Sequence, residues 1–173
     1  MSQIITTMAR LGDGTPIELR PIRPEDEALL QDIASHMTAE DLRRRFFAPV
    51  RVLSHDVAEQ LSHIDYEHAM ALVARTADGQ TGLGAARFVA EPDNCRAEFA
   101  LGVRSDWQRR GLGRVLLARI ANLAASRGVA ELYGDVLREN EGMIGLAHAL
   151  GFTLTAHPTD ATLVRVVKPL GSI

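Results

Sequence analysis

The chain has 173 residues, of which 46% are apolar and 24% are charged, as is typical of one soluble globular domain. Its net charge of −3 and its pI of about 6.1 argue against a nucleic-acid-binding protein, which would carry an excess of basic residues. The single cysteine, Cys95, cannot form an internal disulfide, the first residues lack a signal peptide's apolar segment, and no apolar run approaches the ~20 residues of a membrane span. We therefore expect a cytoplasmic domain that binds neither nucleic acid nor membrane.

The first half of the chain predicts a strand, three short helices and two antiparallel strands. The first strand ends at a turn that begins at Pro21, and Thr38 with Asp41 has the spacing of a helix N-cap pair. Hydrophobic periodicity and turn-forming residues indicate the other boundaries. The expected helices cover residues 25–37, 38–47 and 56–64, and the expected strands cover residues 17–20, 69–75 and 81–90.

The second half predicts a strand over Arg96–Val103, because its odd-numbered residues are apolar and its even-numbered ones are charged or small. An amphipathic helix follows from Leu112 and ends at Gly128. The chain then predicts a strand over 130–137, a helix over 141–150 and strands over 153–155 and 162–167. Since no repeat or linker divides these elements, we expect one mixed α/β domain of α+β character over residues 1–173.

The junction between the strand and the long helix has an unusual composition. A helix N-terminus has unpaired N–H groups and partial positive charge, so it favours acidic residues. This junction instead carries three arginines and two glycines, namely Arg109, Arg110, Arg114, Gly111 and Gly113. Glycine lets an anion approach the backbone closely, and guanidinium groups add charge-assisted hydrogen bonds. The segment therefore predicts a phosphate or pyrophosphate site.

The spacing of this segment distinguishes it from common nucleotide-binding loops. It lacks the Gly-Lys-Ser/Thr ending of a P-loop, and Leu116 stands where a Gly-x-Gly-x-x-Gly loop has its third glycine. It resembles the Gln/Arg-x-x-Gly-x-Gly/Ala pyrophosphate loop of the GNAT superfamily of acyl-CoA-dependent N-acyltransferases. The residues that carry this resemblance are Gln108, Arg109, Arg110, Gly111, Leu112 and Gly113.

Two further segments extend the resemblance. Asn140 and the following run to Gly151-Phe152 resemble the superfamily's fourth helix. The first half resembles the acetyltransferase domain of bacterial protein lysine acetyltransferases, in Leu19–Asp26, Arg44–Phe47, Leu53–His55 and Ile64–Tyr66. The resemblance covers about residues 17–168, the expected core. It implies the GNAT fold, in which a mostly antiparallel sheet holds acyl-CoA between a splayed pair of strands.

The resemblance also implies a co-substrate and roles for individual residues. Acetyl-CoA, or another short acyl-CoA, would bind with its diphosphate on the arginine- and glycine-rich loop, including Arg114. The backbone of Leu101, Gly102 and Val103 would pair with the pantetheine arm and polarise the thioester carbonyl. Glu98 would be the general base that deprotonates an amine. Asn140 would contact the pantetheine region, a role compatible with capping the last helix.

One residue departs from the superfamily pattern. Many relatives have a tyrosine that protonates the departing sulfur, and here Ala147 occupies its position. Water, or less obviously His148 or Tyr133, would protonate the thiolate. His55, His63 and His68 lack the spacing of a zinc site, so we assign no metal.

The acceptor remains open at this stage. We expect transfer of an acetyl group to a primary amine, most simply a protein lysine side chain. The alternatives are a small-molecule amine acetyltransferase and a non-catalytic acyl-CoA-sensing module. Since members of the superfamily often pair through sheet edges, the resemblance also makes a homodimer an expected partner state.

Overall fold

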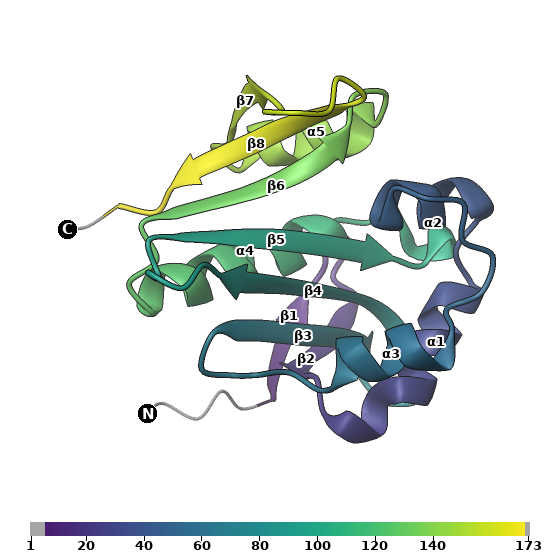
Figure 1. The fold of residues 1–173 in the computed structure, drawn as a ribbon. Coiled ribbons are helices and arrows are strands. Elements are labelled where there is room, and N and C mark those ends of the chain that lie inside the picture. The colour runs from purple at the N-terminus through teal and green to yellow at the C-terminus, as the bar shows by residue number, and fades with distance from the viewer. Residues whose placement is uncertain (1–5, 172–173) are drawn as a thin grey trace.

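The computed structural model describes residues 6–171, which form one open eight-stranded sheet covered by five α-helices and two short 3₁₀ helices (Figure 1). The strands are β1 (Thr7–Arg10), β2 (Pro16–Pro21), β3 (Ala69–Thr76), β4 (Gly82–Ala90), β5 (Arg96–Val103), β6 (Glu131–Leu137), β7 (Thr153–Ala156) and β8 (Leu163–Pro169). The helices are η1 (Pro24–Asp26), α1 (Glu27–Ser35), α2 (Ala39–Phe46), α3 (His55–Ser62), η2 (Ser105–Trp107), α4 (Leu112–Ser126) and α5 (Glu141–Ala149).

The sheet is antiparallel except at one pair of strands. Its order is β1-β2-β3-β4-β5-β6-β8-β7, and only β5 and β6 are parallel. Their ladder covers only Arg96–Glu98 on β5 and Glu131–Tyr133 on β6. Beyond these residues the two strands separate toward α2, as Figure 1 shows. The expected mixed α/β fold with a splayed strand pair is therefore confirmed.

Most of the predicted elements are present, and their ends follow from local chemistry. The backbone N–H of Asp41 donates to the Thr38 hydroxyl, which caps α2, and Ser54 caps α3 in the same way. The helix predicted over residues 25–37 is present as α1, and its first turn is the 3₁₀ helix η1. Strand β1 was missed, because its four residues carry only a short apolar pattern.

The two faces of the sheet carry separate cores. Helix α4 packs on one face with Leu116 and Ile120 fully buried, and α5 covers the same face beyond β6. Helices α1, α2 and α3 lie on the other face, with α1 against β4 and α2 against β5, and there Ile33, Leu42 and Val73 are buried in one cluster. Within the described residues, no helix is both long enough and apolar enough to cross a membrane.

The strands separate at a point where an aromatic ring occupies the space above a glycine. Gly134 of β6 follows Tyr133, the last residue paired with β5. A Cβ atom at Gly134 would lie 2.5 Å from the ring of Phe99 on β5. This ring packs edge-on against Phe152, with the ring centroids 5.5 Å apart. Phe99 therefore acts as a wedge between β5 and β6 that only glycine at position 134 accommodates.

Candidate active site

The space between the separated strands is the main cavity of the described residues. Its volume is about 730 Å³, and it is lined by α2, β5, the loop before α4, the end of β6 and the start of α5. Arg43 of α2 pairs with Glu139, which follows β6, so the two sides of the opening are linked. The topology thus brings segments about 100 residues apart to one site.

The loop before α4 has a strained backbone and free N–H groups. Arg109 and Gly111 have φ of 62° and 89°, in the left-handed region, and Arg109 bears a side chain that disfavours it. Gly111 is the N-cap residue of α4, and it has no side chain to accept from the helix. None of the N–H groups of residues 111–114 donates to an acceptor among the described residues. These are the groups that hold an anion at a helix N-terminus.

The three arginines of the loop separate into two groups. Arg109 and Arg114 are exposed and line the cavity. The side chain of Arg110 turns away, since its guanidinium donates to Asp13 and Thr15 at 3.1 Å each and stacks 4.0 Å from the centre of the Trp107 ring.

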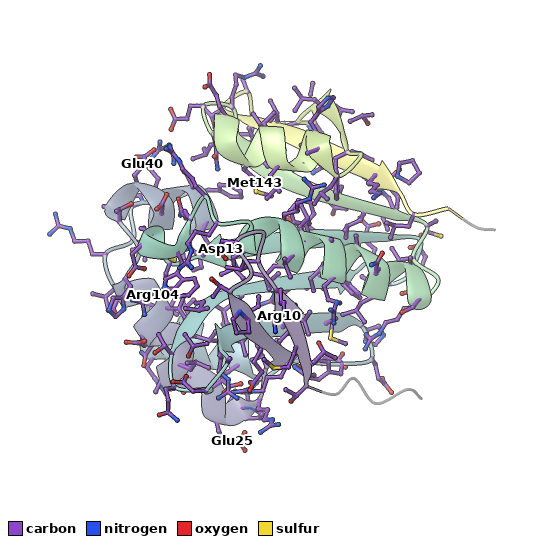
Figure 2. All side chains as sticks on the ribbon, turned by 180° about the vertical axis from the view of Figure 1, so that it is seen from behind. Arg10, Asp13, Glu25, Glu40, Arg104 and Met143 are labelled. Carbon is purple, nitrogen blue, oxygen red and sulfur yellow. The ribbon has the colours of Figure 1, made fainter. Side chains whose placement is uncertain are left out.

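Asp13 lies on the turn between β1 and β2, beside the start of α4 (Figure 2), so the unpredicted strand β1 belongs to the hairpin that supports this loop. Leu112 is also outside the cavity, because its side chain is buried in the core. Arg110 and Leu112 can therefore contribute only backbone groups to the cavity as the structure stands. The Arg110 guanidinium therefore does not face the cavity. For Arg109 and Arg114, a guanidinium contact with a bound anion stays a prediction.

Gln108 and Asp41 join the loop to α2. The Gln108 amide donates to the Asp41 carboxylate at 2.9 Å and to the carbonyl of Val103 at 3.3 Å. The Ser105 hydroxyl donates to the same carboxylate at 2.5 Å. Asp41 was predicted only as a helix-capping residue. It also ties the end of β5 to α2, and nothing in its local sequence indicates this second role.

The predicted pantetheine-binding backbone is open to the cavity. Leu101, Gly102 and Val103 line the cavity and pair with β4, while their opposite edge has no ladder with β6. A strand edge of this kind offers unpaired N–H and C=O groups to an extended ligand. Asn140 also lines the cavity, and its side chain accepts from the N–H of Met143, so it caps α5.

Glu98 lies on the cavity wall where β5 and β6 begin to separate. Partial loss of hydration raises the pKa of its carboxyl, and the negative charge of Asp135 raises it further, against the smaller effects of Arg165 and Arg45. Asp135 itself is held by Arg165 at 2.8 Å and by His157 at 3.4 Å. Within residues 6–171 Glu98 has no ion pair, and a carboxylate with a raised pKa and no direct cationic partner is well suited to accept a proton.

The groups considered for protonating a thiolate lie away from the cavity. Ala147 is fully buried, and His148 is exposed on α5 but absent from the cavity lining. The Tyr133 hydroxyl donates to Glu91 at 3.2 Å. His55 lies near Asp56 and Glu59 on the surface, and His68 lies near Asp65 and Glu67. A ring nitrogen of His63 bonds the carbonyl of Glu59. No metal is assigned to these exposed groups.

Sequence reasoning missed two cationic side chains near Glu98. Arg45 of α2 lines the cavity, and Arg87 of β4 is half-buried on the same face of the sheet as Glu98. The signal for Arg87 was a charged residue inside the otherwise apolar strand Gly82–Ala90. Arg45 was noted only within the Arg44–Phe47 segment.

A family model described as the acetyltransferase (GNAT) family matches residues 30–152. The chain belongs to this family. The expected resemblance is thus confirmed, and so is the expectation that the protein is an N-acetyltransferase.

Individual relatives agree with the family. One relative, an acetyltransferase of Pseudomonas aeruginosa, is 30% identical over 156 residues, which are 89% of this chain and 84% of that protein. The acetyltransferase Pat of Mycolicibacterium smegmatis is 33% identical over 87% of this chain, but the match spans only 45% of Pat. The solved GNAT domain of S. lividans PAT superposes with a TM-score of 0.87 at 26% identity, covering 95% of this chain and 96% of that domain.

Proposed function

We propose that the protein transfers an acetyl group from acetyl-CoA, or from another short acyl-CoA, to a primary amine, with Glu98 as general base. The observation that carries this proposal is the set of unpaired N–H groups at the start of α4, beside the open edge of β5. A diphosphate on those N–H groups and an extended arm along Leu101–Val103 would direct the thioester toward Glu98.

The chemistry then needs few groups. Glu98 takes a proton from the ammonium form of the acceptor, whose reference pKa is ~10.4 for lysine. The free amine attacks the thioester carbonyl carbon, and a backbone N–H of Leu101–Val103 stabilises the negative charge that develops on its oxygen. The C–N bond forms and the C–S bond breaks. The attacking nitrogen loses its second proton to water as the amide forms, and the thiolate takes a proton from water, so no net hydroxide is left. Alignment of the two reactants contributes much of the rate, up to roughly 7–11 kcal/mol.

A protein lysine is the acceptor that we favour. The similarity to Pat and to the S. lividans PAT domain supports it. The charge around Glu98 also bears on the alternatives, since a polyamine acetyltransferase needs an acidic pocket for its cationic substrate. Here Arg45 and Arg87 face the same side of the sheet as Glu98, which disfavours a polyamine.

The test measures thiol release from acetyl-CoA with a lysine peptide, a polyamine and no acceptor, in wild type and in Glu98→Gln. We expect turnover that depends on the peptide and falls by about 10²–10⁴-fold in the variant. Calorimetry of CoA binding to both proteins is the control, because Glu98 does not hold the diphosphate. Tight CoA binding without turnover for any amine would favour the sensing module instead.

A further inference from the structure

Two half-buried arginines, Arg45 and Arg87, lie on the side of the sheet that carries Glu98. Among the described residues they differ from the other partly or fully buried arginines in having no hydrogen-bond or ion-pair partner. Neither Arg45 nor Arg87 forms a hydrogen bond or an ion pair among the described residues, although the Arg45 guanidinium lies 4.7 Å from the centre of the Phe46 ring. Every other partly or fully buried arginine there bonds to a carboxylate, a hydroxyl or a backbone carbonyl. Examples are Arg20 with Asp26, Arg75 with Glu18 and Arg165 with Asp135. No guanidinium nitrogen of Arg45 or Arg87 is among the fully buried unpaired atoms, so solvent reaches both groups and their donors are free to bind an anionic ligand.

The backbone places both side chains close to the predicted reaction centre. Arg87 is directly opposite Ala100 in the β4–β5 ladder and so projects beside Glu98, two residues along β5 on the same face. The aliphatic stem of Arg45 lies over Gly102, since a Cβ there would be 3.7 Å from its Cγ and Cδ. Ala100 and Gly102, both small, lie on the same face and line the cavity together with Arg45.

A small, mainly apolar cavity lies beside the two arginines. Its volume is about 60 Å³, and its walls include Arg45, Arg87, Ala100 and Gly102 as well as apolar side chains of α1. Arg45, Ala100 and Gly102 also line the main cavity, so the two spaces adjoin. This volume suits a chain of one or two methylene groups, and the guanidinium groups suit a charged end on that chain.

The local electrostatics favour an anion. Burial and the positive charge of Arg87 lower the pKa of Arg45 to about 10, against the opposing effect of Glu98, and burial also lowers the pKa of Arg87. Both groups stay protonated at neutral pH, so two repelling cations share a partly dehydrated space. An anion between them would relieve that repulsion and accept hydrogen bonds from both guanidinium groups.

We propose that Arg45 and Arg87 form a subsite for a carboxylate carried on a short methylene chain. Two sources have this chemistry: the acyl chain of a dicarboxylic donor such as succinyl-CoA, and an aspartate or glutamate side chain next to the acceptor lysine. The subsite deepens the proposed function and rests on it, because it acts on the same transfer reaction at Glu98.

The experiment compares matched substrates with and without that carboxylate. The donor arm uses succinyl-CoA and butyryl-CoA with one lysine peptide that carries no acidic residue. The acceptor arm uses acetyl-CoA with lysine peptides that carry either Asp or Asn beside the lysine. For each pair we divide kcat/KM of the substrate with the carboxylate by kcat/KM of the substrate without it. This charged-to-neutral ratio is measured in wild type, Arg87→Gln and Arg51→Gln. Arg51 is a matched control, since it is exposed and has no side-chain partner among the residues described.

We expect a ratio of at least about 10 in one arm for wild type and Arg51→Gln, because hydrogen bonds to charged groups are strong. In Arg87→Gln the ratio should fall toward 1, and Arg45→Gln should have the same effect. The arm that shows this preference identifies the source of the carboxylate. Ratios near 1 in both arms, or a ratio that Arg87→Gln leaves intact, would overturn the subsite.

A second measurement separates this proposal from the proposed function. Calorimetry measures the Kd of the protein for succinyl-CoA and for butyryl-CoA. It also measures the Kd for the acetylated Asp and Asn peptides in the presence of CoA, and neither measurement needs turnover. Tighter binding of a charged member that is lost in Arg87→Gln supports the subsite even if no substrate is turned over. Equal binding within each pair refutes the subsite, whether or not the enzyme acetylates a neutral amine.

Discussion

The wedge between β5 and β6 predicts that Gly134→Ala destabilises the protein. The added Cβ would lie 2.5 Å from Phe99 Cε1 and Cζ, whereas carbon atoms in contact are normally about 3.5–4.0 Å apart. The ring has little room to retreat, because Phe99 is only 6% exposed and packs against Phe152. Overpacking of this kind costs about 1–3 kcal/mol. For a chain of this size we expect Tm to fall by about 2–12 °C.

The assay is thermal and urea unfolding of matched variants. Gly145→Ala is the control, since nothing lies within 4 Å of a Cβ at this position of α5, and alanine should stabilise that helix by up to about 1 kcal/mol. The double variant Gly134→Ala/Phe99→Leu should recover at least about 1 kcal/mol relative to the sum of the single changes. The wedge would be refuted if Gly134→Ala left the free energy of unfolding unchanged. It would also be refuted if the free-energy changes of Gly134→Ala and Phe99→Leu simply added in the double variant.

Three further predictions follow from the described contacts. Partial dehydration and then the charge of Asp135 raise the pKa of Glu98. Asp135→Asn should therefore lower that pKa and move the acidic limb of the kcat/KM profile to lower pH. If the limb does not move, a group other than Glu98 produces it. Gly111→Ala should cost about 1–2 kcal/mol in urea unfolding because of its φ of 89°, and Gly111→Asn should cost less; equal costs would contradict that conformational origin. Asp26→Asn should cost about 3–5 kcal/mol because it leaves Arg20 buried without its partner. Burial alone would raise the pKa of Asp26, but Arg20 lowers it overall from 3.8, so wild-type stability should fall below about pH 4 and the variant should show a shallower loss.

The sequence predicted those parts of the fold that depend on local patterns. Strand β5 was located with both ends correct, because its residues alternate strictly and a glycine-rich loop follows. The start of α4 was correct for a similar reason, since the loop violates ordinary helix-start preferences. Strand β1 could not be predicted, because its stability comes from pairing with β2 rather than from its own four residues.

In the candidate site, too, local sequence patterns were predictable and contacts between distant residues were not. Glu98, Gly111 and Asn140 were predicted because each belongs to a recognisable segment, and the structure brings all three to one cavity. The diversion of Arg110 to Asp13 was not predictable, because the two residues are 97 positions apart and meet only through the β1–β2 turn. Arg87 was missed for a related reason: the sequence does not show which charged strand residue lacks a partner.

A crystal structure of the protein with CoA tests the central claim most directly, which is that the turn before α4 holds the diphosphate and directs the thiol toward Glu98. We expect diphosphate oxygens within hydrogen-bond distance of the N–H groups of residues 111–114. The pantetheine arm should lie along Leu101–Val103, with the sulfur on the Glu98 side of the cavity. CoA bound with its diphosphate away from this turn, or with its sulfur remote from Glu98, would contradict the account.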